Sequence, residues 1–194
     1  MTLPIMTAAQ EWQTRWTLVL AATIGFSYHS VMTAGVGVFM EPWGKEFNWN
    51  RTQTSMGMSI SAGLSALLSP FFGILIDRWG TRRIALPGLV TIAFVMGSFA
   101  LLDGSITMWV SLWVIYGLVG MTVKSTIWTT TVAGAFSKAR GLALGITLAG
   151  TAAGQAITPP LANWLIAEHG WRMAMVYLGV GWCAIALAFC VPFL

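Results

Sequence analysis

Charged side chains are scarce in this sequence of 194 residues. Asp, Glu, Lys and Arg make up 8% of it, whereas a soluble domain carries about 25%. Hydrophobic residues reach 57%, which is more apolar surface than a water-soluble fold of this size can bury. The lack of charge therefore excludes an ordinary soluble domain and indicates a chain that folds in lipid. The formal net charge of +4 is then no sign of nucleic-acid binding.

Motifs of soluble enzymes are also missing. The sequence has no Gly-x-Ser-x-Gly, no Walker glycine loop, no His-Glu-x-x-His and no Cys-x-x-Cys. We therefore expect no enzyme activity, no cofactor, no metal site and no transport driven by ATP hydrolysis. The two cysteines, Cys183 and Cys190, are two helical turns apart in one apolar run, too far for an easy disulfide, and are expected to be packing residues.

What the sequence does contain is a series of long apolar runs. A helix needs about 20 mostly apolar residues to cross a bilayer, and irregular backbone has to leave the hydrocarbon. The expected spans are residues 16–40, 54–76, 84–102, 106–135, 142–167 and 173–194. The sequence thus predicts an all-α membrane protein of six transmembrane helices, forming one bundle over residues 1–194.

The distribution of Lys and Arg gives an expected orientation. One side of the predicted topology holds Arg15, Arg78, Arg82, Arg83, Lys138 and Arg140, and the other holds Lys45, Arg51 and Arg172. Positive residues favour the cytoplasmic side, so residues 1–15 should form a cytoplasmic tail and both termini should lie inside, in the plasma (inner) membrane. Tryptophans expected to lie in an interfacial aromatic belt are Trp16, Trp43, Trp79, Trp109 and Trp171.

An internal repeat appears when the chain is shifted by 90 residues. Residues that match are Pro70, Leu75, Ile76, Gly80 and Arg82 with Pro160, Leu165, Ile166, Gly170 and Arg172. A repeat of three spans inverts the second copy, so residues 16–102 and 103–194 should be two inverted three-helix repeats. Such repeats are typical of secondary transporters, with binding sites near the midplane. Chance similarity between apolar sequences is the alternative.

Residues 73–83 read Gly-Ile-Leu-Ile-Asp-Arg-Trp-Gly-Thr-Arg-Arg. This stretch resembles the Major Facilitator Superfamily signature Gly-x-Leu-x-Asp-Arg-x-Gly-Arg-Arg, and Thr81 departs from the usual basic residue. The resemblance implies half of that family's fold and a gating motif on the loop between the second and third spans. In this motif Gly73 would allow close helix approach and Gly80 a tight reversal. Asp77 would form a charged latch with Arg78, Arg82 and Arg83.

Two further stretches are similar to the monocarboxylate and oxalate–formate carrier group. These are residues 37–51 and residues 136–145, with Gly-Trp-Arg following at 170–172. Members of the superfamily usually have twelve spans. The resemblance therefore implies a partner, either a C-terminal six-helix half or a second copy of the chain.

Lys124 is the first candidate for substrate binding. It lies within the fourth expected span, where a lysine costs at least about 2.5 kcal/mol unless it meets a partner, water or an anion. Neighbouring Thr and Ser residues suggest a wet cavity, so Lys124 is expected to bind an anionic group; pairing with a helix carbonyl or snorkelling is the alternative. The family often carries an arginine where Trp113 stands, and Lys124 would supply that charge almost three turns later on one face.

Four other residues complete the expected substrate site. His29 lies near the middle of the first span, where an imidazole either couples protons or packs as a neutral group. Tyr28, Tyr116 and Trp128 either line the cavity or pack against helices and lipid. The small residues Gly141, Gly145, Ala149 and Ala153, with Gly150 and Gly154 nearby, predict a close helix contact instead.

These features favour secondary transport of a small organic anion by alternating access, with monocarboxylates as the first candidates. A carrier of a neutral metabolite or drug is a second hypothesis, although the family's drug-antiporter signature is not matched on the fifth span. A third is a non-transporting membrane protein, or a half-transporter that is inactive without its partner.

Overall fold

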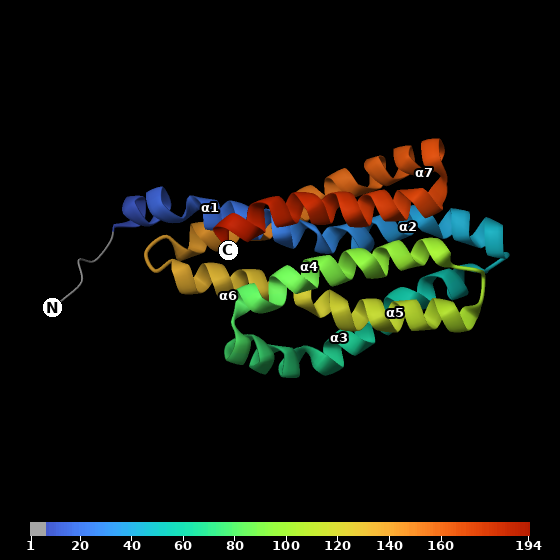
Figure 1. The fold of residues 1–194 in the computed structure, drawn as a ribbon, viewed down its shortest axis with the longest axis horizontal. Helices are drawn as coiled ribbons and strands as arrows, with labels where there is room; N and C mark the ends of the chain where they lie inside the picture. Colours follow the sequence, from blue (N-terminus) through green and yellow to red (C-terminus); the bar gives the residue numbers. More distant parts are fainter. Residues whose placement is uncertain (1–6) are drawn as a thin grey trace.

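The computed structural model describes residues 7–194, all of whose regular elements are helices. They are α1 (Ala8–Ser27), α2 (His29–Phe47), α3 (Arg51–Trp79), α4 (Thr81–Ser98), η1 (Phe99–Leu101), α5 (Ile106–Gly120), η2 (Met121–Val123), α6 (Ser125–Ala135) and α7 (Arg140–Phe193). The helices lie side by side along the long axis of the molecule (Figure 1). The all-helical fold predicted from the sequence is confirmed.

Local capping explains several helix ends. Thr7 and Asn50 each form a capping box with the glutamine three residues later, and Ser105 accepts the backbone N–H of Met108. Asn48 closes α2 in the left-handed conformation, which asparagine tolerates. The chain therefore enters and leaves its helices where the short polar breaks stand in the sequence.

The number of membrane crossings depends on whether α7 is counted as one helix or two. Five helical stretches of the described chain are long and apolar enough to span a membrane: Ala8–Phe47, Arg51–Trp79, Thr81–Leu101, Ile106–Ala135 and Arg140–Phe193. The last has 54 residues and non-helical dihedrals at Gly170, where two antiparallel arms of α7 meet (Figure 1). We call them the N-terminal and C-terminal arms of α7. The count of six crossings stays a prediction.

Two predicted spans are not continuous helices. The first is divided at Tyr28, between α1 and α2, although the dihedrals there stay helical at φ −59° and ψ −33°. The fourth is broken at residues 121–124, between α5 and α6, where Lys124 is extended. The first helix also begins at Ala8, so residues 8–15 of the expected tail belong to it, while residues 1–6 lie outside the described part. Apolar composition could not reveal these breaks, because a break inside a bundle needs no change of hydropathy.

The structure supports the inverted repeat in its backbone and contacts. Gly80 and Gly170, 90 residues apart, have nearly the same dihedrals, with φ 80° and 76° and ψ 152° and 161°. Arg82 Nη2 donates to the carbonyl of Val191, and Arg172 Nη2 donates to the carbonyl of Leu102 at 3.0 Å. Each arginine thus holds the last helix of the other repeat.

The two ends of the bundle differ as the charge pattern predicted. One end holds the N-terminus of α1, the α3–α4 turn, the α6–α7 loop and the C-terminus (Figure 1). There the buried carboxylate of Glu11 accepts bonds from the Ser137 hydroxyl and from the backbone N–H groups of Ser137, Lys138 and Ala139. At the other end Glu46 pairs with Arg172 and accepts a bond from Trp171 Nε1.

The predicted aromatic belt is only partly correct. Trp16 and Trp79 are exposed, but Trp43, Trp109 and Trp171 are buried. The rings of Trp43 and Trp109 lie 4.9 Å apart at 71°, and Trp109 Nε1 donates to the carbonyl of Gln53. These tryptophans fill the interior of the bundle end, where edge-to-face packing of their rings stabilises the fold.

The predicted close contact along the fifth span is made by two of the glycines named for it, Gly150 and Gly154. Gly141 and Gly145 have open space beside them. A Cβ at Gly150 would lie 2.3 Å from the carbonyl oxygen of Thr23, and one at Gly154 would lie 2.9 Å from that of Ser27. The N-terminal arm of α7 therefore approaches α1 through Gly150 and Gly154. Cys183 and Cys190 are buried free thiols.

Candidate functional site

A small polar cavity lies beside the breaks in the first and fourth predicted spans. Its volume is about 190 Å³, and its walls come from α2, α3, α5 and the segment before α6. The lining residues are His29, Met32, Thr33, Met58, Ser61, Ala62, Ser65, Trp113, Tyr116 and Lys124. The structure thus brings together three of the five residues predicted to bind substrate.

Lys124 owes its position to the broken helix. It is the residue before α6, with extended dihedrals of φ −74° and ψ 167°, so it turns the chain between η2 and α6. Within residues 7–194, its ammonium group has no hydrogen bond and no ion pair, and the predicted pairing with a helix carbonyl is not seen. A half-buried lysine without a partner is electrostatically suited to an anion.

His29 begins α2 directly after the interruption at Tyr28. Its ring stacks on Phe26 with centroids 6.3 Å apart and an interplanar angle of 5°. The Nδ1 atom is shielded from solvent and has no hydrogen-bond partner in the described chain, while the ring faces the cavity that Lys124 also lines. The site thus holds an unsatisfied imidazole nitrogen together with an unpaired ammonium group.

Tyr116 and Trp113 form the aromatic wall of the cavity. Their rings lie 5.5 Å apart at 75°, and both side chains are nearly buried. Trp113 fits because α3 has a glycine there: a Cβ at Gly57 would lie 2.1 Å from Trp113 Nε1. Trp113 is therefore a packing surface of the cavity wall, and Lys124 brings a positive charge to the same cavity.

Tyr28 and Trp128 lie outside the cavity. The Tyr28 hydroxyl donates to the carbonyl of Gly179 at 2.8 Å, on the C-terminal arm of α7. Trp128 Nε1 donates to the carbonyl of Val123 at 3.0 Å, and its ring covers Gly25 of α1. Trp128 thus satisfies a carbonyl freed by the break before α6. The contacts of both side chains are those of the packing alternative.

Several cavity residues were not predicted. Ser61 and Ser65 lie four residues apart on α3, and Thr33 lies four residues after His29 on α2, where its hydroxyl donates to the His29 carbonyl. This i, i+4 spacing of small polar residues within apolar runs was the available signal. It became informative only once the facing helices were known.

The predicted gating motif lies at the end of the bundle that holds the start of α1 and the C-terminus (Figure 1). Asp77 and Arg78 are exposed in the last turn of α3, Gly80 makes the reversal, and Arg83 is exposed at the start of α4. Among residues 7–194, Asp77 forms no ion pair with these arginines. A Cβ at Gly73 would meet open space, so the close helix approach predicted there is not found.

Five helical stretches of the described chain that are long and apolar enough to span a membrane, packed around a polar cavity, define an integral membrane protein. The sequence profile described as Major Facilitator Superfamily matches residues 7–194. The chain therefore belongs to the Major Facilitator Superfamily.

Two relatives are similar over most of this chain. Monocarboxylate transporter 14 from Homo sapiens is 31% identical over 181 residues, which cover 91% of this chain and 34% of the human protein. Monocarboxylate transporter 14 from Mus musculus is also 31% identical over 181 residues, covering 91% of this chain and 33% of the mouse protein. The chain thus spans about a third of the length of these relatives.

Proposed function

We propose that this chain forms one half of a secondary transporter that carries a small organic anion by alternating access. Monocarboxylates are the first substrates to test, because the relatives are named as monocarboxylate transporters. The observation that carries the proposal is Lys124, an unpaired cation at a helix break beside His29 in a polar cavity. Broken helices that present charge at midplane depth are the usual way such carriers hold an ion.

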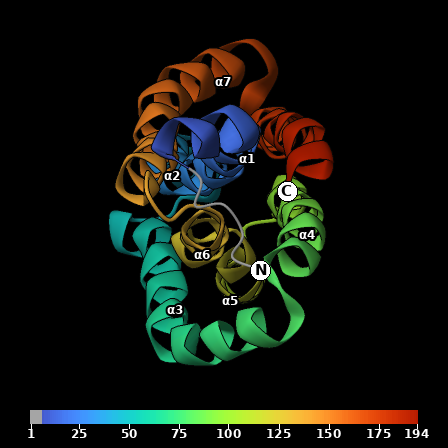
Figure 2. The same cartoon turned by 90° about the vertical axis from the view of Figure 1, so that its left-hand side faces the viewer.

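The proposal includes a second bundle that closes the other wall of the pathway. The strongest support is the exposed apolar surface of α3, where Leu67, Phe71 and Ile74 are 72%, 67% and 59% exposed. Figure 2 shows α3 at the outside of the bundle, with α6 further inside. We propose that a C-terminal six-helix half or a second copy covers this side and that Asp77 and Arg78, in the last turn of α3, latch against it. We also propose that the protein lies in the plasma (inner) membrane with both termini on the cytoplasmic side.

The test is equilibrium binding of radiolabelled lactate to the purified chain, followed by uptake into proteoliposomes. Lys124→Ala should weaken lactate binding at least about tenfold, because a charged hydrogen bond contributes about 1.5–3 kcal/mol. Lys124→Arg should recover part of the affinity. Lys138→Ala, which removes an exposed lysine at one end of the bundle, is the matched control and should bind as the unmodified chain does.

Each result separates the candidate functions. Unchanged lactate binding in Lys124→Ala would refute the proposed site. Lactate binding without uptake, followed by uptake when a six-helix partner is added, would identify a half-transporter that is inactive alone. Binding of neutral solutes in preference to lactate would favour a carrier of neutral metabolites or drugs.

A further inference from the structure

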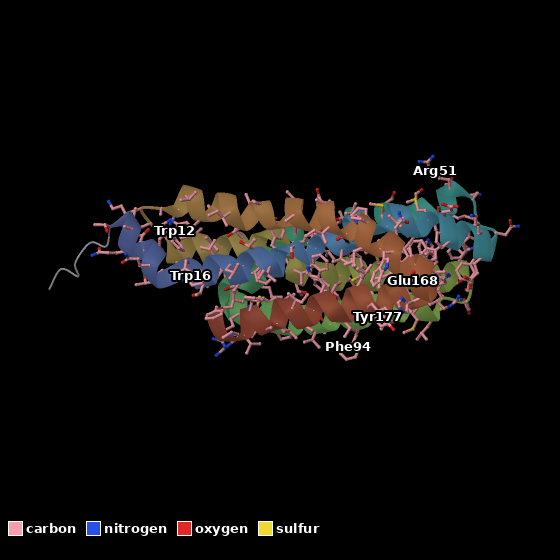
Figure 3. All side chains as sticks on the ribbon, turned by 90° about the horizontal axis from the view of Figure 1, so that it is seen from above. Trp12, Trp16, Arg51, Phe94, Glu168 and Tyr177 are labelled. Carbon is pink, nitrogen blue, oxygen red and sulfur yellow. The ribbon has the colours of Figure 1, made fainter. Side chains whose placement is uncertain are left out.

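A second and larger cavity lies on the outer side of the bundle, away from Lys124. It has a volume of about 530 Å³ and runs between α4 and the C-terminal arm of α7. Its walls include Val90 and Phe94 of α4, Leu101 of η1, and Val180, Ala184 and Leu187 of α7. Phe94 projects outward from this side of the molecule (Figure 3) and is 73% exposed. The groove therefore faces the surroundings of the bundle.

The lining of the groove suits hydrocarbon. Only two of its side chains, Ser98 and Cys183, carry a polar atom, and both have acceptors within the chain. The Ser98 hydroxyl donates to the carbonyl of Phe94, and the Cys183 thiol donates to the carbonyl of Leu89. No polar group in the groove is left to hydrate or to bind a polar ligand, so an alkyl chain fits it without a desolvation cost.

An arginine lies on the same exposed face of α4 as the groove, nearer the start of the helix. Arg83 precedes Val90 by seven residues, or two helical turns, and long side chains on a helix point toward its N-terminus. Arg83 is exposed and has no ion pair within residues 7–194. From Arg83 to Gly97 is about 21 Å along the helix, close to the half-thickness of a bilayer with its headgroups, about 20–22 Å.

Arg82, beside it, has unused hydrogen-bonding capacity. Its repeat counterpart Arg172 bonds both the Leu102 carbonyl and the carboxylate of Glu46. Arg82 bonds only the Val191 carbonyl, and no carboxylate pairs with it in the described chain. A guanidinium group has five donors, and the place that Glu46 takes at Arg172 is open at Arg82.

We propose that this surface binds one anionic phospholipid. Its phosphate lies between Arg82 and Arg83, taking the place that Glu46 has at Arg172, and one acyl chain fills the groove between α4 and the C-terminal arm of α7. In the orientation proposed above, the lipid belongs to the cytoplasmic leaflet, where anionic headgroups and basic residues attract one another. The site is independent of the cavity at Lys124.

The experiment is a lipid titration of the detergent-purified chain, followed by native mass spectrometry. Phosphatidylglycerol and phosphatidylcholine with identical acyl chains are the two probes. Phosphatidylglycerol should bind more tightly, and Arg83→Gln should weaken its binding about fivefold, the effect of one basic residue near a charged lipid surface. Lys138→Gln removes a charge at the same end of the bundle and should leave the affinity unchanged.

The acyl-chain contact is tested by filling the groove. Gly97→Leu adds a side chain where open space exists and should lower the occupancy of both lipids. Gly181→Leu fills a different groove, between α1 and the two arms of α7, and should not affect the occupancy. Arg82→Gln is a second variant and should weaken phosphatidylglycerol binding as Arg83→Gln does.

Three results would overturn the proposal. The first is equal affinity for the two lipids, and the second is equal effects of Arg83→Gln and Lys138→Gln. The third is displacement of phosphatidylglycerol by glycerol phosphate alone at equal concentration, since this would identify an anion site without an acyl-chain groove. Because lipid binding is measured directly, none of these results depends on whether the chain transports lactate.

Discussion

The turn at Gly80 and the turn at Gly170 lie at opposite ends of the bundle and occupy equivalent places in the two repeats. Both glycines have φ near 80° with an extended ψ, and both are followed two residues later by an arginine that bonds a distant carbonyl. Only the Gly170 turn adds an acidic partner, Glu46, to its arginine. The repeat thus reproduces backbone geometry more faithfully than it reproduces ion pairs.

A helix contact also recurs in both repeats at equivalent positions but with different residues. Gly154 of α7 lies against Ser27 of α1, and the positions 90 residues away, Leu64 and Gly117, also lie against each other. The glycine comes from α7 in the first contact and from α5 in the second, although the position equivalent to Gly154 is Leu64 on α3. Close approach therefore requires one small residue per contact but does not fix which helix supplies it.

The largest expected effect compares the approach of α7 to α1, here at Gly150 and Thr23, with the approach of α5 to α3 at Gly117. Gly150→Ala should cost about 3 kcal/mol of stability, because its Cβ would lie 2.3 Å from a backbone oxygen that cannot move alone. Gly117→Ala should cost about 1 kcal/mol, since its Cβ would lie 3.1 Å from Leu64 Cδ1 and 3.2 Å from Ser61 Cα, which are longer contacts that a small shift relieves. Unfolding in detergent measures both, with Gly145→Ala in open space as the control. Equal losses would contradict the proposed difference.

An intermediate loss of stability is expected at the turns made by Gly80 and Gly170. Gly80→Ala and Gly170→Ala should each lower stability by about 2 kcal/mol, because their shared dihedrals are accessible almost only to glycine. Neither Cβ would meet another atom, so conformational strain is the only cause. The same unfolding measurement should give equal losses for the two variants. A clear inequality would show that one turn can relax and the other cannot.

The smallest loss of stability is expected for Arg82 and Arg172, the arginines that follow these turns. Arg172→Gln should destabilise the bundle by about 1 kcal/mol, because it removes a partly exposed ion pair with Glu46 and a bond to the Leu102 carbonyl. Arg82→Gln should cost about half as much in detergent without anionic lipid, since it loses only the bond to Val191. Adding phosphatidylglycerol should bring the two losses closer together if Arg82 holds a phosphate.

Much of the fold could be predicted from the sequence because lipid imposes a simple rule. Uncharged runs of sufficient length have to be helical, and polar breaks have to lie outside the hydrocarbon. The loop residues 73–83 also indicated the family. The interruptions at Tyr28 and before α6 were missed, since both lie inside apolar or weakly polar runs where composition does not change.

The candidate site was predicted only in part. Lys124 and His29 stand out because polar groups within spans are costly, and the structure places both in one cavity with Tyr116. Tyr28 and Trp128 carry the same signal in sequence, yet their polar atoms bond the carbonyls of Gly179 and Val123 instead. Whether an aromatic side chain lines a cavity depends on which carbonyl lies within its reach.

The sequence by itself determined that this protein is a helical bundle in lipid, with most of its positive charge at one end and two related halves. These properties follow from hydropathy and charge, which each residue carries regardless of its neighbours. Tertiary structure alone decided which glycines meet α1, which tryptophans are buried, and where Lys124 faces a cavity. Those outcomes depend on the register between helices far apart in the chain, and no single run of residues contains that register.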